Sequence, residues 1–583
     1  MHDTRLGRLP RRWRPARLPM AMLAAMALGV VPALGAASSI TSRILIDPVG
    51  EHTGDLFGTS VAWVGDVNGD GDDDLLIGAF RYPEIASVGQ AYLYFGGPAI
   101  DAVADLVIPA PAGGSGWFGV SVASAGDFNG DGHPDFIIGA QQAGYEGKAF
   151  VYYGGPSLDA TPDFTLTGES TGYLTGFGAS VASAGDMNGD GFGDVIVGAP
   201  LYGSGGNQNG RAYLFFGGAV PDAVPDRVFS GVGAYDQLGS VVGSAGDLNG
   251  DGHPDLFATA PNNDAAALNA GLIDVWFGGP GLDATPDLTL LGSGVNEHLM
   301  SAANAGDVNA DGFSDLIGAG RGQVRVWFGG AVPNAVADLT LARSYASVAG
   351  AGDVDGDGID DFAVGAPNDP GGSRVSVYLG GIAVDTLEDL HYVANDPGAA
   401  IGIALAGGGH VDGPGPADLI ASAYWDPESI GYNMGRVYVI ANASLGTGTC
   451  PGQADGTACN DGNACTIGEV CGGGVCGGGG PALPPAVNGS VSLVGNGAGA
   501  TIGWTDSPGP FSVYRGARSG GSPWSYNQTC HDRRIVASSA TDSENPSIGT
   551  MFFYLVTRVD GCGESIPGLD SGGQPNPNPA PCP

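Results

Sequence analysis

The residues best suited to do chemistry are carboxylates and amides that alternate within short glycine-rich stretches. The first stretch, GDVNGDGDDDLLIGA at residues 65–79, places Asp66, Asn68, Asp70 and Asp74 at positions 1, 3, 5 and 9. In a tight loop, alternate residues can turn their oxygens toward one point, and the backbone carbonyl of position 7 can join them. Six or seven hard oxygen donors favour Ca²⁺, whereas the absence of Cys and His ligands argues against zinc.

This loop differs from an EF-hand. An EF-hand needs a bidentate glutamate at position 12, followed by a helix. Position 12 is Ile77, inside an apolar run. We therefore expect the loop to join two antiparallel strands, with Asp74 at the entry of the second strand.

The stretch recurs along the chain, which turns a common turn-like signal into a specific one. Further copies begin at residues 126, 185, 246, 306 and 352. Their candidate calcium ligands are Asp127, Asn129, Asp131, Asp135, Asp186, Asn188, Asp190, Asp194, Asp247, Asn249, Asp251, Asp255, Asp307, Asn309, Asp311, Asp315, Asp353, Asp355, Asp357 and Asp361. Solvated surface turns are the alternative, but they do not explain aspartates at positions 1, 5 and 9 in each copy. We predict about six calcium sites.

A seventh copy, GGHVDGPGPADLIASA at residues 408–423, is damaged. It has His410, Asp412, Pro414 and Asp418 at positions 1, 3, 5 and 9. Proline supplies no side-chain oxygen. We therefore predict that this loop is empty or weakly filled.

The repeat period of about sixty residues indicates a repeat architecture. Each unit reads as four short strands; in the second unit these are SVASAGD, DFIIGA, KAFVYYGG and DFTLTG. The seventh unit lacks a fourth strand, and SRILIDPVG at residues 42–50 can supply it. The prediction is an all-β fold whose main part, residues 40–447, is a seven-bladed β-propeller closed by an N-terminal strand. A non-closing solenoid is the alternative.

The repeats resemble the FG-GAP repeat of the integrin α-subunit N-terminal propeller. The FG pairs are Phe57-Gly58, Phe118-Gly119 and Phe177-Gly178, and the GAP triplets are Gly198-Ala199-Pro200 and Gly365-Ala366-Pro367. The resemblance implies calcium hairpins on the lower face of the propeller and ligands on the upper face. The sequence departs from the pattern at Leu238-Gly239, Leu299-Met300 and Ile401-Gly402, and no integrin leg domains follow. A heterodimeric receptor is therefore not implied.

Composition and the two ends of the chain limit partners and location. The net charge of −40 and the single lysine, Lys148, exclude nucleic acid as an expected partner. Residues 1–37 read as a secretory signal peptide, with an uncleaved membrane anchor as the alternative, and no later segment is apolar enough to span a bilayer. We therefore expect a secreted or cell-surface protein.

The eight cysteines all follow residue 449. Residues 450–476 contain five of them without zinc spacing, which predicts a small disulfide-rich module of undetermined connectivity. Residues 477–486 read as a linker and residues 571–583 as an extended tail. Residues 487–570 resemble a fibronectin type III-like β-sandwich of secreted bacterial proteins.

Three functions are considered for this architecture. The first is an adhesion or protein-binding scaffold, and the second is a carbohydrate-binding, lectin-like propeller. A hydrolase or lyase is less favoured, because GESTG at residues 168–172 lacks the strand-to-helix turn of a nucleophile elbow. Aromatic residues on the upper-face loops either contact a protein or glycan ligand or pack their own loops; they are Tyr82, Tyr145, Tyr202, Tyr424 and Trp425. The oligomeric state stays open.

Overall fold

A computed structural model gives the arrangement of the chain. It describes residues 29–30, 41–52, 54–83, 87–114, 116–343, 347–367, 372–382, 384–393, 400–413, 415–423 and 434–443, together with strands β30–β40 further on. Among these residues, no helix has the length and apolar character needed to cross a membrane.

Seven antiparallel sheets account for residues 41–443, as the repeat count predicts. Blade 1 contains β3 (Ser60–Gly65), β4 (Asp74–Ala79), β5 (Gln90–Tyr94) and β6 (Leu106–Pro109). Blade 2 contains β7 (Phe118–Gly126), β8 (Asp135–Ala140), β9 (Lys148–Tyr152) and β10 (Phe164–Thr167). Blade 3 contains β11 (Ser180–Gly185), β12 (Asp194–Ala199), β13 (Arg211–Phe215) and β14 (Arg227–Ser230), with the short helix η1 (Ser204–Gly206) before β13.

The remaining blades repeat this order. Blade 4 contains β15 (Val242–Gly246), β16 (Asp255–Ala260), β17 (Leu272–Trp276) and β18 (Leu288–Leu291). Blade 5 contains β19 (Ser301–Gly306), β20 (Asp315–Gly320), β21 (Gln323–Trp327) and β22 (Leu339–Leu341). Blade 6 contains β23 (Ser347–Gly352), β24 (Asp361–Ala366), β25 (Arg374–Tyr378) and β26 (Leu390–Val393), and β1 (Gly29–Val30) pairs with β26.

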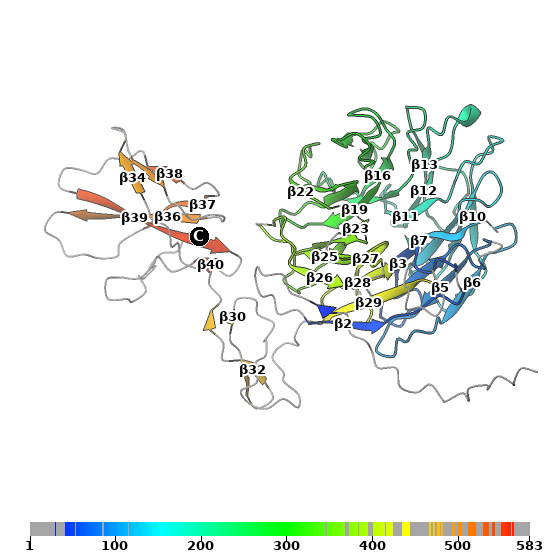
Figure 1. Cartoon of the computed structure of the whole chain (residues 1–583), viewed down its shortest axis with the longest axis horizontal. Coiled ribbons are helices and arrows are strands. Elements are labelled where there is room, and N and C mark those ends of the chain that lie inside the picture. Colours follow the sequence, from blue (N-terminus) through cyan, green and yellow to red (C-terminus); the bar gives the residue numbers. More distant parts are fainter. Residues whose placement is uncertain are drawn as a thin grey trace, which may run out of the picture.

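Blade 7 closes the ring with strands from both ends of the array. It contains β27 (Leu405–Gly409), β28 (Asp418–Ala423), β29 (Arg436–Ala443) and β2 (Thr41–Ile46), and β2 pairs antiparallel with β29. Figure 1 shows the sheets around a common centre, with blue β2 beside yellow β29. The predicted N-terminal closing strand is confirmed, and the solenoid alternative is excluded because innermost β27 contacts innermost β3.

The hydrophobic core is divided among the seams between blades. Seven buried clusters exist, and each combines side chains from two adjacent sheets. The second strand of every blade is buried along its whole length, as its apolar run predicts. Because every blade packs on two neighbours, closing the ring leaves no terminal blade with an uncovered apolar face.

Glycines of the second strand in one blade lie against glycines that precede or begin the first strand of the next blade. A side chain at Gly78 would overlap the carbonyl oxygen of Gly119 in the next blade, and Gly198 has the same relation to Gly239. The second strand of one blade therefore approaches the backbone that precedes the first strand of the next. Only glycine permits this approach without displacing the neighbouring chain.

Antiparallel order places the connections on two faces. Loops between first and second strands, and between third and fourth strands, lie on one face, which we call the lower face. Loops between second and third strands, and the connections from blade to blade, lie on the upper face. The acidic repeats are therefore all on the lower face.

Strands β30–β40 are described by their backbone pairing only. They are β30 (Thr466–Ile467), β31 (Val470–Gly472), β32 (Val475–Gly477), β33 (Gly480–Pro481), β34 (Ser492–Gly495), β35 (Ala500–Gly503), β36 (Phe511–Ser519), β37 (Thr529–Ile535), β38 (Ser539–Asp542), β39 (Thr550–Asp560) and β40 (Gly563–Glu564). The predicted disulfides and the tail lie outside the described residues, whereas the predicted linker contains β33 and the last residue of β32. The disulfide-rich module and the β-sandwich stay predictions.

Candidate metal centres

Each acidic loop begins with a glycine-induced bulge. In blade 1, Gly65 ends the first strand with φ +76° and pairs with Asp74, and the register shifts just before this pair. A glycine in the left-handed region suits such a bulge, because it bends the strand without a Cβ clash. Five more loops have the same positive-φ glycine before position 1. The invariant "GD" of the six intact copies therefore turns the chain into the loop.

The aspartate at position 1 folds the loop around itself. Asp66 accepts hydrogen bonds from the backbone N–H groups of Gly69 at 2.7 Å, Asp70 at 2.8 Å and Gly71 at 2.8 Å. The same three bonds form at the leading aspartates Asp127, Asp186, Asp247 and Asp353. Asp307 accepts two of them. The carboxylate is thus oriented toward the loop interior.

Positions 3 and 5 are linked to each other. Nδ2 of Asn68 donates to Oδ2 of Asp70 at 2.9 Å, and the N–H of Asp70 donates to Oδ1 of Asn68 at 2.7 Å. In the fifth loop the amide differs, because Oδ1 of Asn309 is buried and accepts no hydrogen bond. A buried carbonyl oxygen without a donor needs another partner, and a bound cation would provide one.

The aspartate at position 9 is fully buried and holds two parts of the blade together. Asp74 accepts the N–H of Val67 through Oδ2 and the N–H of Gly96, at the end of the third strand, through Oδ1, each at 2.9 Å. All seven loops repeat this arrangement, including the damaged copy through Asp418. Position 9 is therefore a structural residue as well as a candidate ligand.

This double role was missed in the sequence. The signal for it is present, because Asp418 is retained in the copy that has lost the side-chain oxygen of position 5. A residue kept for metal alone would have no reason to persist there. Because each oxygen of a carboxylate has two lone pairs, one hydrogen bond to each oxygen leaves capacity for a cation.

Burial raises the pKa values of the position 9 carboxyls well above the value of a free aspartate. Desolvation is the main cause that raises the pKa of Asp74 to about 7, and the nearby carboxylates of Asp70 and Asp66 raise it as well. The two backbone N–H groups oppose this effect only in part. The pKa values of the equivalent residues are raised to about 7 at Asp135, Asp194, Asp255 and Asp315, and to about 9 at Asp361. A cation would favour the ionised form in each loop.

The sixth loop brings three carboxylates together. Oxygen atoms of Asp353, Asp355 and Asp361 lie within 4.8 Å of one another. Positions 1, 3, 5 and 9 of the six intact loops offer only carboxylate and amide oxygens, which are ligands for a hard cation. The residues present therefore fit Ca²⁺ by donor type, and the raised pKa values fit a site that needs positive charge.

The acidic loops also join adjacent blades. The backbone carbonyl of position 2 accepts a hydrogen bond from a glycine that follows the third strand of the next blade. In the first loop, Val67 accepts from Gly155 at 2.7 Å. Five further loops make this bond, at Phe128, Met187, Leu248, Val308 and Val411. A metal held in one loop would thus stiffen a seam between two blades.

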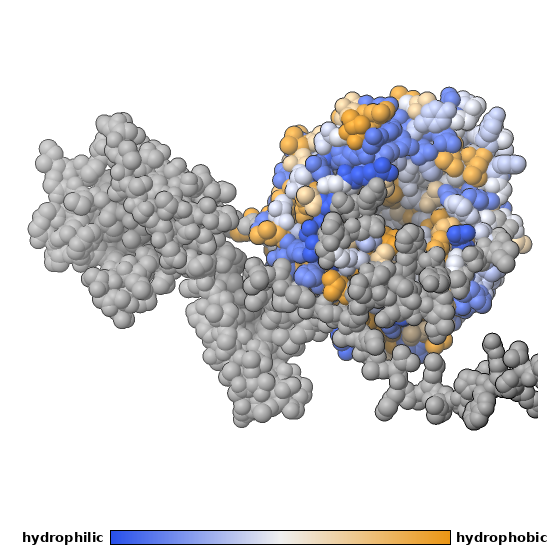
Figure 2. Space-filling view, in the orientation of Figure 1, coloured by the Kyte–Doolittle hydropathy of each residue, from blue (hydrophilic) through white to orange (hydrophobic). Residues whose placement is uncertain are grey.

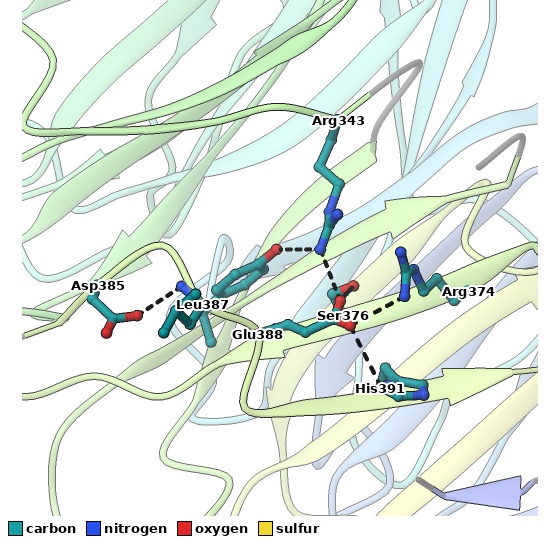
Figure 3. Close-up of polar contacts among 8 residues, drawn as sticks. Arg343, Arg374, Ser376, Asp385, Leu387, Glu388 and His391 are labelled. Atoms are coloured by element: carbon teal, nitrogen blue, oxygen red, sulfur yellow. Dashed lines mark hydrogen bonds and ion pairs between the residues drawn. The ribbon is translucent and has the colours of Figure 1, made fainter. Parts of the chain in front are cut away.

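A charged cluster in blade 6 has a structural explanation. Figure 3 shows Glu388 of blade 6 in contact with Arg343 at 2.8 Å, Arg374 at 3.1 Å and the hydroxyl of Ser376 at 2.7 Å. Other blades have alanine or proline immediately before the matching aspartate. Because donors occupy both its oxygens, Glu388 is best explained as an ion-pair link to the connection from blade 5.

The predicted upper-face aromatics divide into two groups. Tyr82 stacks on His52 with ring centroids 5.3 Å apart, and Tyr202 lies under the guanidinium group of Arg211 at 3.9 Å. Tyr82 therefore packs against the connection between β2 and β3, and Tyr202 packs against the first residue of β13, at the end of its own loop. Tyr145 is exposed. Tyr424 and Trp425 lie outside the described residues.

Comparison with known proteins agrees with the repeat pattern. The FG-GAP repeat model matches residues 57–94, 118–152, 177–215, 239–276 and 344–378. Integrin alpha-5 of Xenopus laevis is 37% identical over 171 residues, which are 27% of this chain and 16% of that protein. Phosphatidylinositol-glycan-specific phospholipase D of Bos taurus is 34% identical over 180 residues, 28% of this chain and 21% of that protein.

Integrin alpha-7 of Homo sapiens is 35% identical over 168 residues, 28% of this chain and 14% of that protein. The matches thus span about a fifth or less of these curated relatives. A solved structure of BBS1N, in complex with ARL6DN, matches with a TM-score of 0.42 and 11% identity over 67% of this chain and 96% of that chain. The matched segments coincide with propeller blades, so the chain contains FG-GAP repeats and its propeller is similar in these segments to integrin α subunits.

Proposed function

We propose that this chain is a secreted or cell-surface binding scaffold, held in shape by Ca²⁺ in six lower-face loops and presenting its upper face to an extracellular protein. The residues that would hold the ions are those at positions 1, 3, 5 and 9 of the intact loops. The observation that carries the proposal is the buried carboxyl at position 9, beside further carboxylates and without a neutralising side chain. Bound calcium would supply the missing charge.

The upper face has properties expected of a binding surface. Several upper-face loops of blades 2–5 expose large apolar side chains; these are Tyr145, Tyr173, Val232, Tyr235, Leu268 and Val295. On the face visible in Figure 2, hydrophobic residues form small patches separated by hydrophilic ones. Exposed tyrosines on loops of a rigid scaffold are common at recognition sites.

Hydrogen bonds between neighbouring loops pre-organise this region. The N–H of Thr175 donates to the carbonyl of Tyr145 at 2.9 Å, and the N–H of Tyr235 donates to that of Asn207 at 2.7 Å. The N–H of Asn296 donates to the carbonyl of Leu268 at 2.7 Å. A surface whose loops are already fixed loses less conformational entropy on binding.

A lectin-like function is the second candidate. Side-chain amides form a chain across the same loops, in which Gln237 donates to Gln208 at 3.0 Å and Asn262 donates to Gln237 at 2.9 Å. Exposed tyrosines next to oriented amides would suit sugar hydroxyls and ring faces. We expect no enzymatic activity, although the phospholipase D relatives are named as enzymes.

Two measurements test the proposal. Metal analysis of the purified chain should give about six calcium ions, and a chelator should lower its melting temperature; calcium-independent melting would refute the calcium proposal. Binding should then be screened on arrays of extracellular proteins and of glycans. Tyr173→Ser with Tyr235→Ser should weaken protein binding, while the lower-face pair Val332→Ser with Val336→Ser should not. Glycan binding alone would support the lectin reading instead.

A further inference from the structure

The seventh loop keeps the position 9 hydrogen bonds and the bond to the next blade, although it has lost donors for a metal. Asp418 accepts the N–H of Val411 at 2.9 Å and the N–H of Asn442 at 3.0 Å, as position 9 does elsewhere. The carbonyl of Val411 accepts the N–H of Gly97 from blade 1 at 2.7 Å. The loop therefore keeps these backbone contacts, but it has fewer carboxylates, because His410 and Pro414 replace two aspartates.

A side-chain cation reaches this loop from the other end of the chain. Nη2 of Arg43, in the closing strand β2, lies 2.7 Å from Oδ2 of Asp412 at position 3. The two residues are 369 positions apart in sequence. Arg43 pairs with Ala441, which follows the third-strand core of blade 7 as Phe95 does in blade 1.

In the other blades, an aspartate stands directly before the fourth strand and binds the backbone at the end of the third. Asp105 accepts the N–H of Phe95 at 2.8 Å, and the matching aspartates of the next five blades make the same bond at 2.8–2.9 Å; they are Asp163, Asp226, Asp287, Asp338 and Asp389. The closing strand β2 brings Arg43 to the lower face beside an acidic loop. The guanidinium of Arg43 thus lies beside the loop that lacks metal donors at positions 1 and 5.

The surroundings of the seventh loop are acidic, and a cation would reduce the repulsion between these carboxylates. Oδ2 of Asp73 in the first loop accepts the N–H of His410 at 2.9 Å, and the N–H of Asp73 donates to the carbonyl of His410 at 3.3 Å. Asp72 lies beside Asp73, and the approach of Gly413 to Asp72 brings the two loops together. The seam between last and first blades thus collects carboxylates from both loops.

We propose that Arg43 is the resident cation of the seventh loop, where it pairs with the position 3 carboxylate of Asp412 in place of a metal ion. This inference rests on the proposed function for the count of six ions. Its consequence is that the contact between the two ends of the ring does not depend on calcium. The chain would then bind six ions rather than seven.

The first experiment restores the lost donors in the full-length chain and counts bound calcium after dialysis. His410→Asp with Pro414→Asp gives the loop carboxylates at positions 1, 3, 5 and 9; position 414 itself lies outside the described residues. We expect six ions in the parent chain, six in this double variant, and seven when Arg43→Ala is added. As a control, Arg436→Ala in the double variant should leave six, because Arg436 pairs with Asp47 at the opposite end of the blade.

Seven ions in the parent chain, or in the double variant with Arg43 intact, would overturn the inference while leaving the proposed function in place. No bound calcium in the parent chain would refute the proposed function instead. In that case a second measurement tests the role of Arg43, because it is made on the metal-free protein and does not depend on calcium binding.

The second experiment measures hydrogen exchange of β2 and β29 in the chelated protein. Arg43→Glu should speed exchange of these amides about five- to tenfold, as expected when a surface ion pair becomes a like-charge contact. Arg436→Glu should leave lower-face exchange unchanged. Unchanged exchange in Arg43→Glu would show that the guanidinium does not hold the loop to the closing strand.

Discussion

Removal of calcium should make the stability of this propeller fall as pH rises, and the pKa values of the position 9 carboxyls set the pH range. In the metal-free protein, burial raises the pKa of Asp74 from 3.8 to about 7. Below pH 3.8 this carboxyl is protonated in the folded and unfolded states alike. Between pH 3.8 and about 7 the unfolded chain has lost the proton and the folded chain keeps it, so rising pH favours unfolding.

The size of the effect follows from the same values. At about 1.4 kcal/mol per pH unit, a pKa of about 7 in place of 3.8 lowers the free energy of unfolding by about 4 kcal/mol for one loop once both states are ionised. Four other position 9 carboxyls have the same raised pKa. A typical domain has a total stability of only about 5–15 kcal/mol. The metal-free propeller should therefore be severely destabilised at neutral pH.

Thermal melting with and without chelator, at pH 5.0 and pH 7.5 and constant ionic strength, tests this reasoning. We expect the chelated protein to melt lower at pH 7.5 than at pH 5.0. Excess calcium should raise the melting temperature on the order of 10 °C or more at pH 7.5. It should act only slightly at pH 5.0, where protons already neutralise the buried carboxyls. An equal calcium effect at both values, or a chelated protein more stable at pH 7.5, would refute it.

Two further predictions separate structural roles from metal binding. Asp74→Asn and Asp418→Asn should each lower the free energy of unfolding by about 1–3 kcal/mol, because an amide –NH₂ would face a backbone N–H donor. Only Asp74→Asn should lose a calcium ion by metal analysis; equal losses would contradict the assignment of the seventh loop. Gly198→Ala should destabilise by about 3 kcal/mol in denaturant titration, because its Cβ would overlap the carbonyl of Gly239. Gly281→Ala, with no heavy atom within 4 Å of the new Cβ, should change stability little, and equal effects would contradict the seam argument.

Repetition made the fold predictable from this sequence. A single run such as DLLIGA at residues 74–79 is ambiguous, but its recurrence with the same loop before it identifies a unit. The closing strand β2 could be predicted because the last unit lacked a fourth strand and SRILIDPVG had no unit of its own. Both inferences depend on comparing copies rather than on local propensity.

Pairings between distant residues could not be predicted in the same way. The contacts of Arg43 with Asp412 and of Glu388 with Arg343 are exceptions to the repeat. Comparison with the other copies therefore could not predict them. The contacts of position 9 also involve the residues after the third strand of the blade. The spacing of residues within the loop gives no information about that strand. The exposure of the aromatic residues could not be predicted either. Tyr82 and Tyr145 occupy similar loops in the sequence, but Tyr145 is exposed and Tyr82 stacks on His52.

The closing strand also sets an order of events during synthesis. β2 begins at Thr41 and its partner β29 ends at Ala443, so about 400 residues separate the two halves of blade 7. At about 5–20 residues per second, the first strand waits about 20–80 s for its partner to be made. Blades 1 to 6 can assemble on their neighbours in that interval, whereas the final seam must form last and over the longest loop. Slow or failed closure would leave strand edges open to other chains, so the vulnerable period of this protein's life should be the interval just before its ends meet.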